Sequence, residues 1–257
     1  MLQRWWILGI ITSFSLVPIY IVHSEAVGIW LLDERTGKAT ADASGNRNDG
    51  KLVGTIRWTA KGKIGTALEG NGEPGWVEIP SSDSLKRAEG PFTVMAWAKI
   101  NVAGQHGIFT KSTDAPVKHQ DWGLYVWDGK IRFAGNWPEG WTAGKFTGKS
   151  NIKEDQWLHF AVTWGEKKMI FYLNGKVDAK FDWNDNFKDT EASVIIGADP
   201  AGGDEPLNGS VDEVAMFDEV LSNENIQKAM NGLEKFLAVD SLGKLATAWA
   251  KMKNIYQ

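Results

Sequence analysis

The adjacent pair Asp212-Glu213 is the nearest approach in this sequence to a paired-carboxylate centre. Cleavage of a glycosidic bond requires two carboxyl groups that flank the bond, one acting as an acid and the other as a nucleophile or base. The surrounding residues predict a β-strand, in which successive side chains point to opposite faces. These two carboxylates therefore cannot act on one bond, and a hydrolase would need carboxylates that converge from separate loops.

The four histidines, His23, His106, His119 and His159, have neither metal-ligand spacing nor a visible catalytic partner. We predict loops for His106 and His119 and the open face of a strand for His159. The absence of cysteine excludes disulfides, thiolate zinc sites and thiol nucleophiles. A formal net charge of −4 without a dense Lys/Arg block makes nucleic acid an unexpected partner.

Two loops could bind a cation through oxygen ligands, which Ca²⁺ prefers. Residues 42–50 read Asp-Ala-Ser-Gly-Asn-Arg-Asn-Asp-Gly. Asp42 could bind calcium there, or its carboxylate could accept hydrogen bonds from amides of its own loop. The acidic loop 199–205 could likewise ligate a cation or form a solvated turn. Both alternatives stay open for each loop.

Tryptophan is over-represented, with 14 residues in the chain. Indole rings on surface loops suit ligands with one apolar and one polar side, such as sugars. We predict ligand contacts for Trp127 at a hairpin mouth and for Trp137 and Trp141 in a Gly/Pro loop; Trp183, in an Asp/Asn-rich loop, is a lesser candidate. Tryptophans within regular strands are predicted to lie in the core: Trp97, Trp157 and Trp164.

Short apolar-aromatic segments separated by Gly, Asn and Asp predict an all-β sandwich of antiparallel strands. Asp128-Gly129 and Asn174-Gly175 each predict a tight hairpin, because these residues tolerate positive φ angles. Ser222 can cap a short helix, and the spacing within 242–252 predicts a second, amphipathic helix that docks on the sandwich or on a partner. The expected strands are 28–32, 67–68, 76–79, 92–100, 107–111, 122–127, 130–134, 157–164, 168–173, 176–181, 193–196 and 210–217.

The N-terminal segment carries Arg4, an apolar run over 5–22 and then Ser24-Glu25-Ala26, a pattern typical of a cleaved signal peptide. The alternative is an uncleaved membrane anchor, interrupted by Pro18. We predict a signal peptide over 1–26, a sandwich domain over 27–232 and a helical extension over 233–257. The protein is then secreted, periplasmic or on the cell surface, with no membrane span after signal removal.

Four ordered segments resemble laminin G-like, concanavalin A-like jelly-roll domains, relatives of pentraxins and legume lectins, over about residues 27–232. They are Ile29-Trp30 with the 42–50 loop; 92–97; 157–164 running into the hairpin at Asn174-Gly175; and 207–217, with Ser222 opening a helix. The resemblance implies a two-sheet antiparallel jelly roll with a short C-terminal helical segment.

The same resemblance implies function and metal ligands. The sugar-cleaving enzymes of this fold carry a strand with the pattern Glu-x-Asp-x-x-Glu, which this sequence lacks. By resemblance Asp42 and Asp212 share one structural calcium, with Asn46 completing its shell. We expect a non-catalytic module that binds a glycan or polysaccharide. The alternatives are a protein-interaction or adhesion domain, and an atypical glycoside hydrolase.

Overall fold

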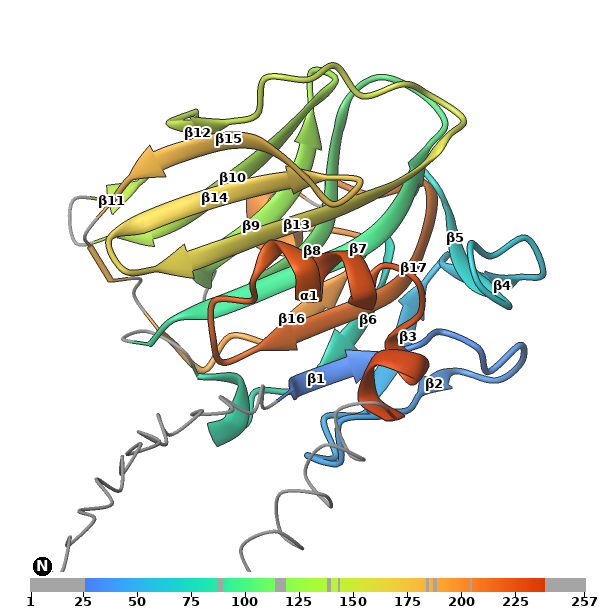
Figure 1. Ribbon diagram of the computed structural model, residues 1–257. Coiled ribbons are helices and arrows are strands. Elements are labelled where there is room, and N and C mark those ends of the chain that lie inside the picture. Colours follow the sequence, from blue (N-terminus) through green and yellow to red (C-terminus); the bar gives the residue numbers. More distant parts are fainter. Residues whose placement is uncertain are drawn as a thin grey trace, which may run out of the picture.

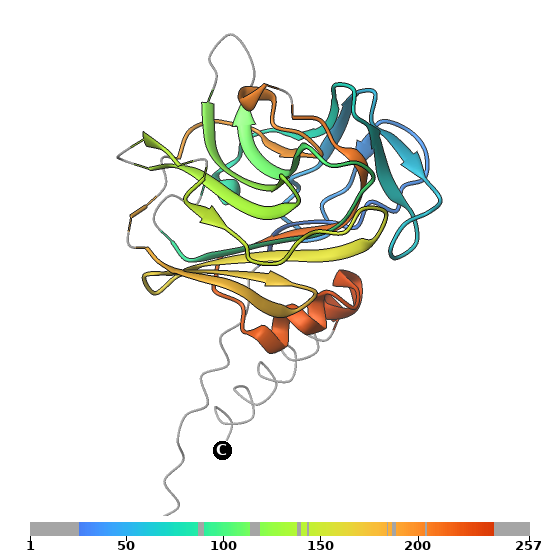
Figure 2. The ribbon, with the colours of Figure 1, turned by 90° about the horizontal axis from the view of Figure 1, so that it is seen from above.

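Two antiparallel sheets stack face to face in the computed structural model, and helices cover the outer side of one of them (Figures 1 and 2). This layered arrangement confirms the expected jelly-roll sandwich. The structure describes residues 26–86, 90–113, 119–137, 140–142, 144–183, 185–186, 189–203 and 205–238.

The first sheet, called here the eight-stranded sheet, has β17 near its centre, paired with β7, β5 and β1. Its strands in spatial order are β15 (Lys176–Asp182), β14 (Lys168–Leu173), β13 (Trp157–Gly165), β7 (Phe92–Ile100), β17 (Asn208–Phe217), β5 (Ala67–Asn71) and β4 (Arg57–Thr59), with β1 (Ala26–Trp30) also paired to β17.

The second sheet is called here the nine-stranded sheet. Its strands in spatial order are β11 (Gly140–Trp141), β10 (Lys130–Trp137), β9 (His119–Trp127), β8 (Gln105–Thr113), β16 (Val194–Ile196), β6 (Gly75–Ile79), β3 (Gly50–Gly54) and β2 (Ala39–Thr40), with β12 (Phe146–Thr147) also paired to β10. Two short 3-10 helices, η1 (Asp83–Leu85) and η2 (Pro200–Gly202), lie in connecting segments.

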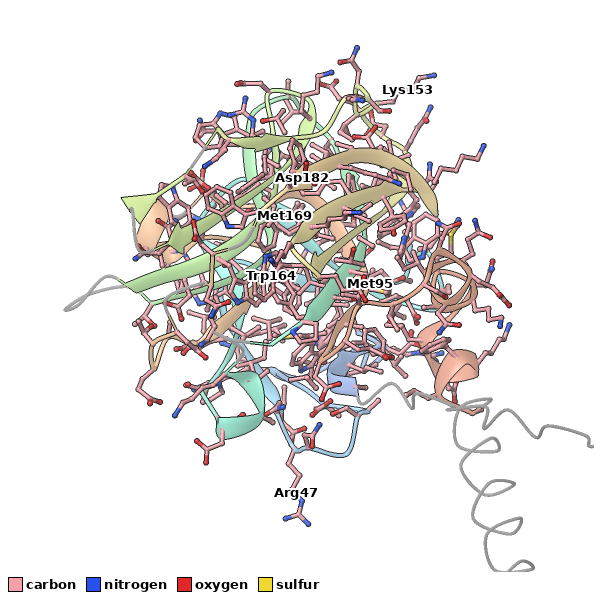
Figure 3. The ribbon with its side chains drawn as sticks, turned by 60° about the vertical axis from the view of Figure 1, so that its left-hand side comes forward. Arg47, Met95, Lys153, Trp164, Met169 and Asp182 are labelled. Atoms are coloured by element: carbon pink, nitrogen blue, oxygen red, sulfur yellow. The ribbon has the colours of Figure 1, made fainter. Side chains whose placement is uncertain are left out.

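Side chains point alternately to the two faces of each strand, and those that point inward form the core between the sheets. In β9, Trp122 and Leu124 point into this core and stay buried. In β13, Trp164 does the same, and Met169 of β14 lies beside it in the register (Figure 3). The intervening residues of β9, including Tyr125, therefore occupy the outer face of the nine-stranded sheet.

Both hairpin predictions are confirmed. Asp128 and Gly129 join β9 to β10 with φ angles of 50° and 65°, and Asn174 and Gly175 join β14 to β15 with φ angles of 50° and 69°. Two consecutive positive φ values match the twist of the flanking strands, which explains the choice of Asp-Gly and Asn-Gly.

Helix α1 (Asn223–Ala229) begins as expected, because the Ser222 side chain accepts a hydrogen bond from the Asn225 backbone N–H. The helix packs on the outer face of the eight-stranded sheet and forms a second apolar cluster with Met95 and Phe217 (Figure 3). Residues 233–238 are also helical and extend this cluster.

The helical cover corrects the prediction for His159. This residue lies on the outer face of β13 but is only 1% exposed, with its ring 5.4 Å from that of Trp97. Trp97 is buried on the same side and donates to the Met230 carbonyl oxygen. Burial lowers the pKa of His159 to about 3, so its imidazole is neutral at physiological pH.

Every strand expected from the sequence is present, and five short strands were not anticipated: β2, β3, β4, β11 and β12. The loop predictions for His106 and His119 are wrong, because His106 lies within β8 and His119 begins β9. The signal-peptide stretch before Ala26 and the helix expected over 242–252 lie outside the described residues. Among those that are described, no helix is long and apolar enough to cross a membrane.

Candidate functional site

A small cavity of about 190 Å³ opens on the outer face of the nine-stranded sheet. It brings together two of the tryptophans predicted to contact a ligand, Trp127 and Trp141. Trp137 ends β10 close by in sequence, but its side chain lies outside the described part of the chain. The described residues that line the cavity are Gln120, Tyr125, Trp127, Ala134, Trp141 and Glu205.

Trp127 is held in place by polar contacts at the end of β9. The Gln105 amide, oriented so that both its atoms are paired, accepts from Trp127 Nε1 at 2.7 Å and donates to Glu205 Oε1 at 3.3 Å. The Arg132 guanidinium lies 4.7 Å from the centroid of the Trp127 ring. Trp141 of β11 is 37% exposed, so its indole is accessible to a ligand.

Tyr125 crosses the sheet surface above Gly123. A Cβ atom on Gly123 would lie 2.2 Å from Tyr125 Oη, so only glycine leaves room for this ring. The Tyr125 hydroxyl donates to Asp199 Oδ2 at 2.6 Å, and the Gln120 amide donates to the same oxygen. Burial, reinforced by the Asp199 charge, holds the pKa of Tyr125 well above its usual value.

Asp199 and Glu205 come from the acidic loop noted in the sequence. Asp199 is fully buried, so a solvated turn is the wrong description of its environment. Burial raises the pKa of Glu205 to about 7, and the nearby Asp199 charge adds to this shift. Glu205 is the only carboxylate among the described lining residues, and it can hydrogen-bond to ligand hydroxyls as an acceptor or, when protonated, as a donor.

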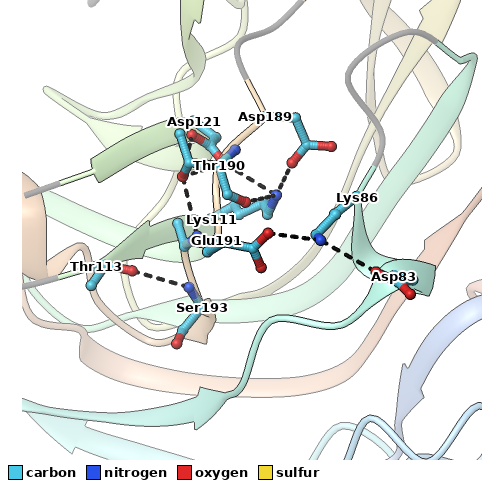
Figure 4. Close-up of polar contacts among 10 residues, drawn as sticks. Asp83, Lys86, Lys111, Thr113, Asp121, Asp189, Thr190, Glu191 and Ser193 are labelled. Carbon is cyan, nitrogen blue, oxygen red and sulfur yellow. Dashed lines mark hydrogen bonds and ion pairs between the residues drawn. The ribbon is translucent and has the colours of Figure 1, made fainter.

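A second acidic cluster lies on the same sheet, between β8, β9 and the segment before β16 (Figure 4). The Lys111 ammonium, 1% exposed, pairs with Asp121 at 3.1 Å and with Asp189, and donates to the Thr190 carbonyl at 3.0 Å. Asp121 in turn accepts from the Thr190 backbone N–H at 2.9 Å. Lys111, Asp121, Asp189 and Thr190 are called here the Lys111 cluster, and their contacts attach the segment before β16 to the sheet.

The Asp42 carboxylate accepts four hydrogen bonds at 2.8–3.0 Å from Ile29 N, Ser44 N, Ser44 Oγ and Asn48 N. The Asn46 side chain donates to the carbonyls of the first two residues of β1 at 2.8 and 3.0 Å. The Asp42 carboxylate thus accepts hydrogen bonds from its own loop, and the contacts of Asp42 and Asn46 tie the loop to β1.

Asp212 makes a different set of contacts. Its carboxylate accepts from the backbone N–H groups of Lys63, Ile64 and Glu213 at 2.8–2.9 Å, and burial raises its pKa to about 8. Glu213, at a bulge of β17 with φ 50°, accepts from Leu233 N at 2.6 Å. Among the donors that the described residues supply, Asp42 and Asp212 share none.

Across the residues that the structure describes, no group of three or more His, Asp or Glu side chains is placed to hold a metal ion. The calcium site expected from Asp42, Asn46 and Asp212 stays a prediction.

Comparison with known proteins gives one family. The model of the concanavalin A-like lectin/glucanases superfamily matches residues 71–227, which include β9, β10, β11 and the acidic loop. A search of curated protein sequences finds no match.

Similar solved structures are binding domains. Domain 4 of AbnA, an extracellular arabinanase from Geobacillus stearothermophilus solved with arabinotriose, gives a TM-score of 0.63 at 20% identity, covering 80% of this chain and 98% of that one. The binding domain of Paraclostridial Mosquitocidal Protein 1 gives 0.64 at 13% identity, covering 79% and 51%. The binding domain of botulinum neurotoxin DC, solved with rat synaptotagmin II, gives 0.60 at 12%, covering 80% and 51%.

The present chain therefore spans about half the length of the two toxin domains and nearly all of the arabinanase domain. At these identities the likeness establishes the fold alone. The neighbours show that this fold serves as a binding domain in several proteins, for a glycan in one and for a protein in another.

Proposed function

Because the chain belongs to the concanavalin A-like lectin/glucanase superfamily, we propose that it is an exported, non-catalytic module that binds a glycan on the outer face of its nine-stranded sheet. The observation that carries this proposal is the convergence of Trp127 and Trp141 on one cavity beside Glu205. An indole supplies an apolar surface for a sugar ring, and the carboxyl and amide groups supply hydrogen bonds to hydroxyls.

The carboxylates of this site support binding rather than hydrolysis. Asp199 is fully buried and accepts hydrogen bonds from Tyr125 and Gln120, so it does not line the cavity. Glu205 is then the one carboxylate among the described residues that line the cavity, whereas glycosidases use two carboxyl groups that flank the bond. Release of reducing sugar from glycans bound by the purified protein would revive the hydrolase alternative.

A glycan array probed with the wild type, Trp141→Ala and Trp141→Phe tests the proposal. We expect Trp141→Ala to lose about tenfold or more in affinity, equivalent to about 1.4 kcal/mol, because the exposed indole is removed. Trp141→Phe keeps an aromatic face and should retain most of the binding. Equal affinity of Trp141→Ala and wild type for every bound glycan contradicts the assignment.

The array also separates the protein-interaction alternative. A wild-type protein that binds no glycan on a broad array, yet retains its fold by circular dichroism, favours a protein partner. Structural calcium is tested on the same material by melting it with calcium and with chelator. A melting temperature that does not respond contradicts a calcium site at Asp42, Asn46 and Asp212.

A further inference from the structure

A larger cavity, of about 650 Å³, lies at the end of the eight-stranded sheet, where β13 turns into β14. It shares no described lining residue with the cavity at Trp141. Its volume falls in the range of about 300–1,000 Å³ that is usual for small-molecule sites. Four segments form its walls: Pro91, the turn 164–167, Trp183 with Asn186, and residues from Glu219 to Asn225.

The two indoles that line the cavity, those of Trp164 and Trp183, are held in place by contacts within the protein. Trp183 carries the Lys145 ammonium 3.6 Å from its ring centroid, and the Phe146 ring meets it edge-on at 5.2 Å. The Trp183 backbone N–H donates to the Lys167 carbonyl at 3.0 Å. Trp164 is only 6% exposed and packs against Phe92, with ring centroids 5.8 Å apart. The two indoles are therefore held rigidly, and a rigid wall loses little entropy on binding.

The turn at the mouth of the cavity has an unusual backbone. Glu166 and Lys167 have φ angles of 50° and 62°, in the left-handed region that non-glycine residues seldom adopt. A Cβ atom on Gly165 would lie 2.5 Å from Val220 and 2.9 Å from Pro91, both of which line the cavity. The close approach that glycine permits here brings the charged turn against the opposite wall.

The remaining wall is anchored to β7. Thr93 Oγ1 donates to the Glu219 carbonyl at 2.6 Å and accepts from the Leu221 backbone N–H at 3.0 Å. Ser222, which follows, caps α1. This segment presents Glu219, Ser222 and Asn225 to the cavity.

The lining chemistry selects a ligand class. Among the described lining residues, two carboxylates, Glu166 and Glu219, accompany the ammonium of Lys167, and the Lys145 ammonium on Trp183 balances the charge, so no excess positive charge favours an anion. A cation is already stacked on Trp183, which disfavours a second one there. Asparagine, serine and the charged groups would lose hydrogen bonds to water against an apolar ligand. A neutral ligand with many hydroxyls and a small apolar part fits both the parts of the two indoles that line the cavity and the polar groups.

From this geometry we infer that the cavity at the β13–β14 turn is a second site for a neutral mono- or disaccharide, separate from the site at Trp141. The inference rests on the proposed function for the nature of the ligand, but the two sites use different residues. Each can therefore be tested in the absence of the other.

Indole N–H resonances of the ¹⁵N-labelled protein report on each site, once they are assigned with single Trp→Phe variants. The probes are glucose, galactose, arabinose, xylose, mannose, N-acetylglucosamine and the disaccharides built from them. We expect at least one probe to shift the Trp183 and Trp164 signals in the wild type and equally in Trp141→Ala. Trp183→Ala should abolish the Trp164 shift, and Lys167→Ala should weaken it without altering the fold.

Lys168→Ala is the matched control, since Lys168 is exposed beside the turn but does not line the cavity. Shifts confined to Trp127 and Trp141 overturn the second site and leave the proposed function standing. Shifts confined to Trp183 and Trp164 support the second site and remove the one at Trp141. No indole shift with any probe overturns both, and an equal loss in Lys167→Ala and Lys168→Ala also contradicts the second site.

Discussion

The two acidic clusters of the nine-stranded sheet stabilise their buried carboxylates in different ways. In the Lys111 cluster, a buried ammonium lies between Asp121 and Asp189. In the cluster beside Trp127, Asp199 accepts from the neutral groups of Tyr125 and Gln120, and within the described residues Glu205 forms no ion pair. The first cluster pairs both of its carboxylates with one buried ammonium and serves stability. The second contains Glu205, a carboxyl group whose pKa is raised to about 7.

The largest expected effect is the loss of the buried cation. Lys111→Met leaves Asp121 and Asp189 without their ammonium, and removal of one partner from a buried pair costs about 3–5 kcal/mol. Urea unfolding at neutral pH measures this free energy. Lys86→Met is the matched control, because Lys86 forms the neighbouring ion pairs with Glu191 and Asp83 at the surface (Figure 4).

The control should change stability far less than Lys111→Met, because exposed ion pairs contribute little. Equal destabilisation by the two lysine substitutions would show that the Lys111 cluster is no more important than a surface pair, and would remove the contrast between the clusters.

A smaller effect is expected at Tyr125. Tyr125→Phe removes the hydroxyl that donates to buried Asp199, and a hydrogen bond to a charged group contributes about 1.5–3 kcal/mol. Tyr172→Phe is the control, since its hydroxyl interacts with the neutral side chain of Thr163 and not with a carboxylate, and its loss should cost about 0.5–1.5 kcal/mol. Thermal and urea unfolding compare the two. If Tyr125→Phe costs no more than its control, the Asp199 carboxylate does not depend on Tyr125.

The smallest effect is a pH dependence at Glu205. Its pKa is raised from 4.5 to about 7 in the folded protein, so the folded state favours the protonated form, and Glu205 destabilises the fold increasingly as pH rises from about 4.5 to about 7. After allowance for partial solvent exposure, Glu205→Gln should exceed the wild type in stability by about 1 kcal/mol at pH 8, with the advantage vanishing near pH 4.

Glu191→Gln is the control for this pH series. Lys86 lowers the pKa of Glu191, so its contribution has the opposite sign: it stabilises the fold at neutral pH and is lost as pH falls. A pH profile of Glu205→Gln that runs parallel to that of the wild type from pH 4 to 8 contradicts a raised pKa at Glu205.

Local signals account for what the sequence predicted of the fold. The hairpins at Asp128-Gly129 and Asn174-Gly175 follow from backbone preferences of the turn residues themselves. The strands β2, β4, β11 and β12 were missed because they have only two or three residues, too few for an alternating pattern. Their pairing depends on the strands already beside them.

The sequence predicted those site residues whose side chains are at least partly exposed because they lie next to a turn. Trp127 and Trp141 lie at strand ends and converge on one cavity. Contacts between residues far apart in sequence were missed: Tyr125 and Asp199 are 74 residues apart, and Lys111 and Asp189 are 78 apart. One signal was available, since Lys111 and Asp121 are charged residues of β8 and β9, and a charge in a strand is buried only with a partner.

The two ends of the described chain leave the sandwich on the same side. Ala26 and the helical residues Phe236 and Leu237 all pack on the apolar cluster outside the eight-stranded sheet, opposite the face that carries Trp141 (Figure 1). A tether that joined the described chain at Ala26 or after Leu237 would therefore meet the module on the side away from Trp141.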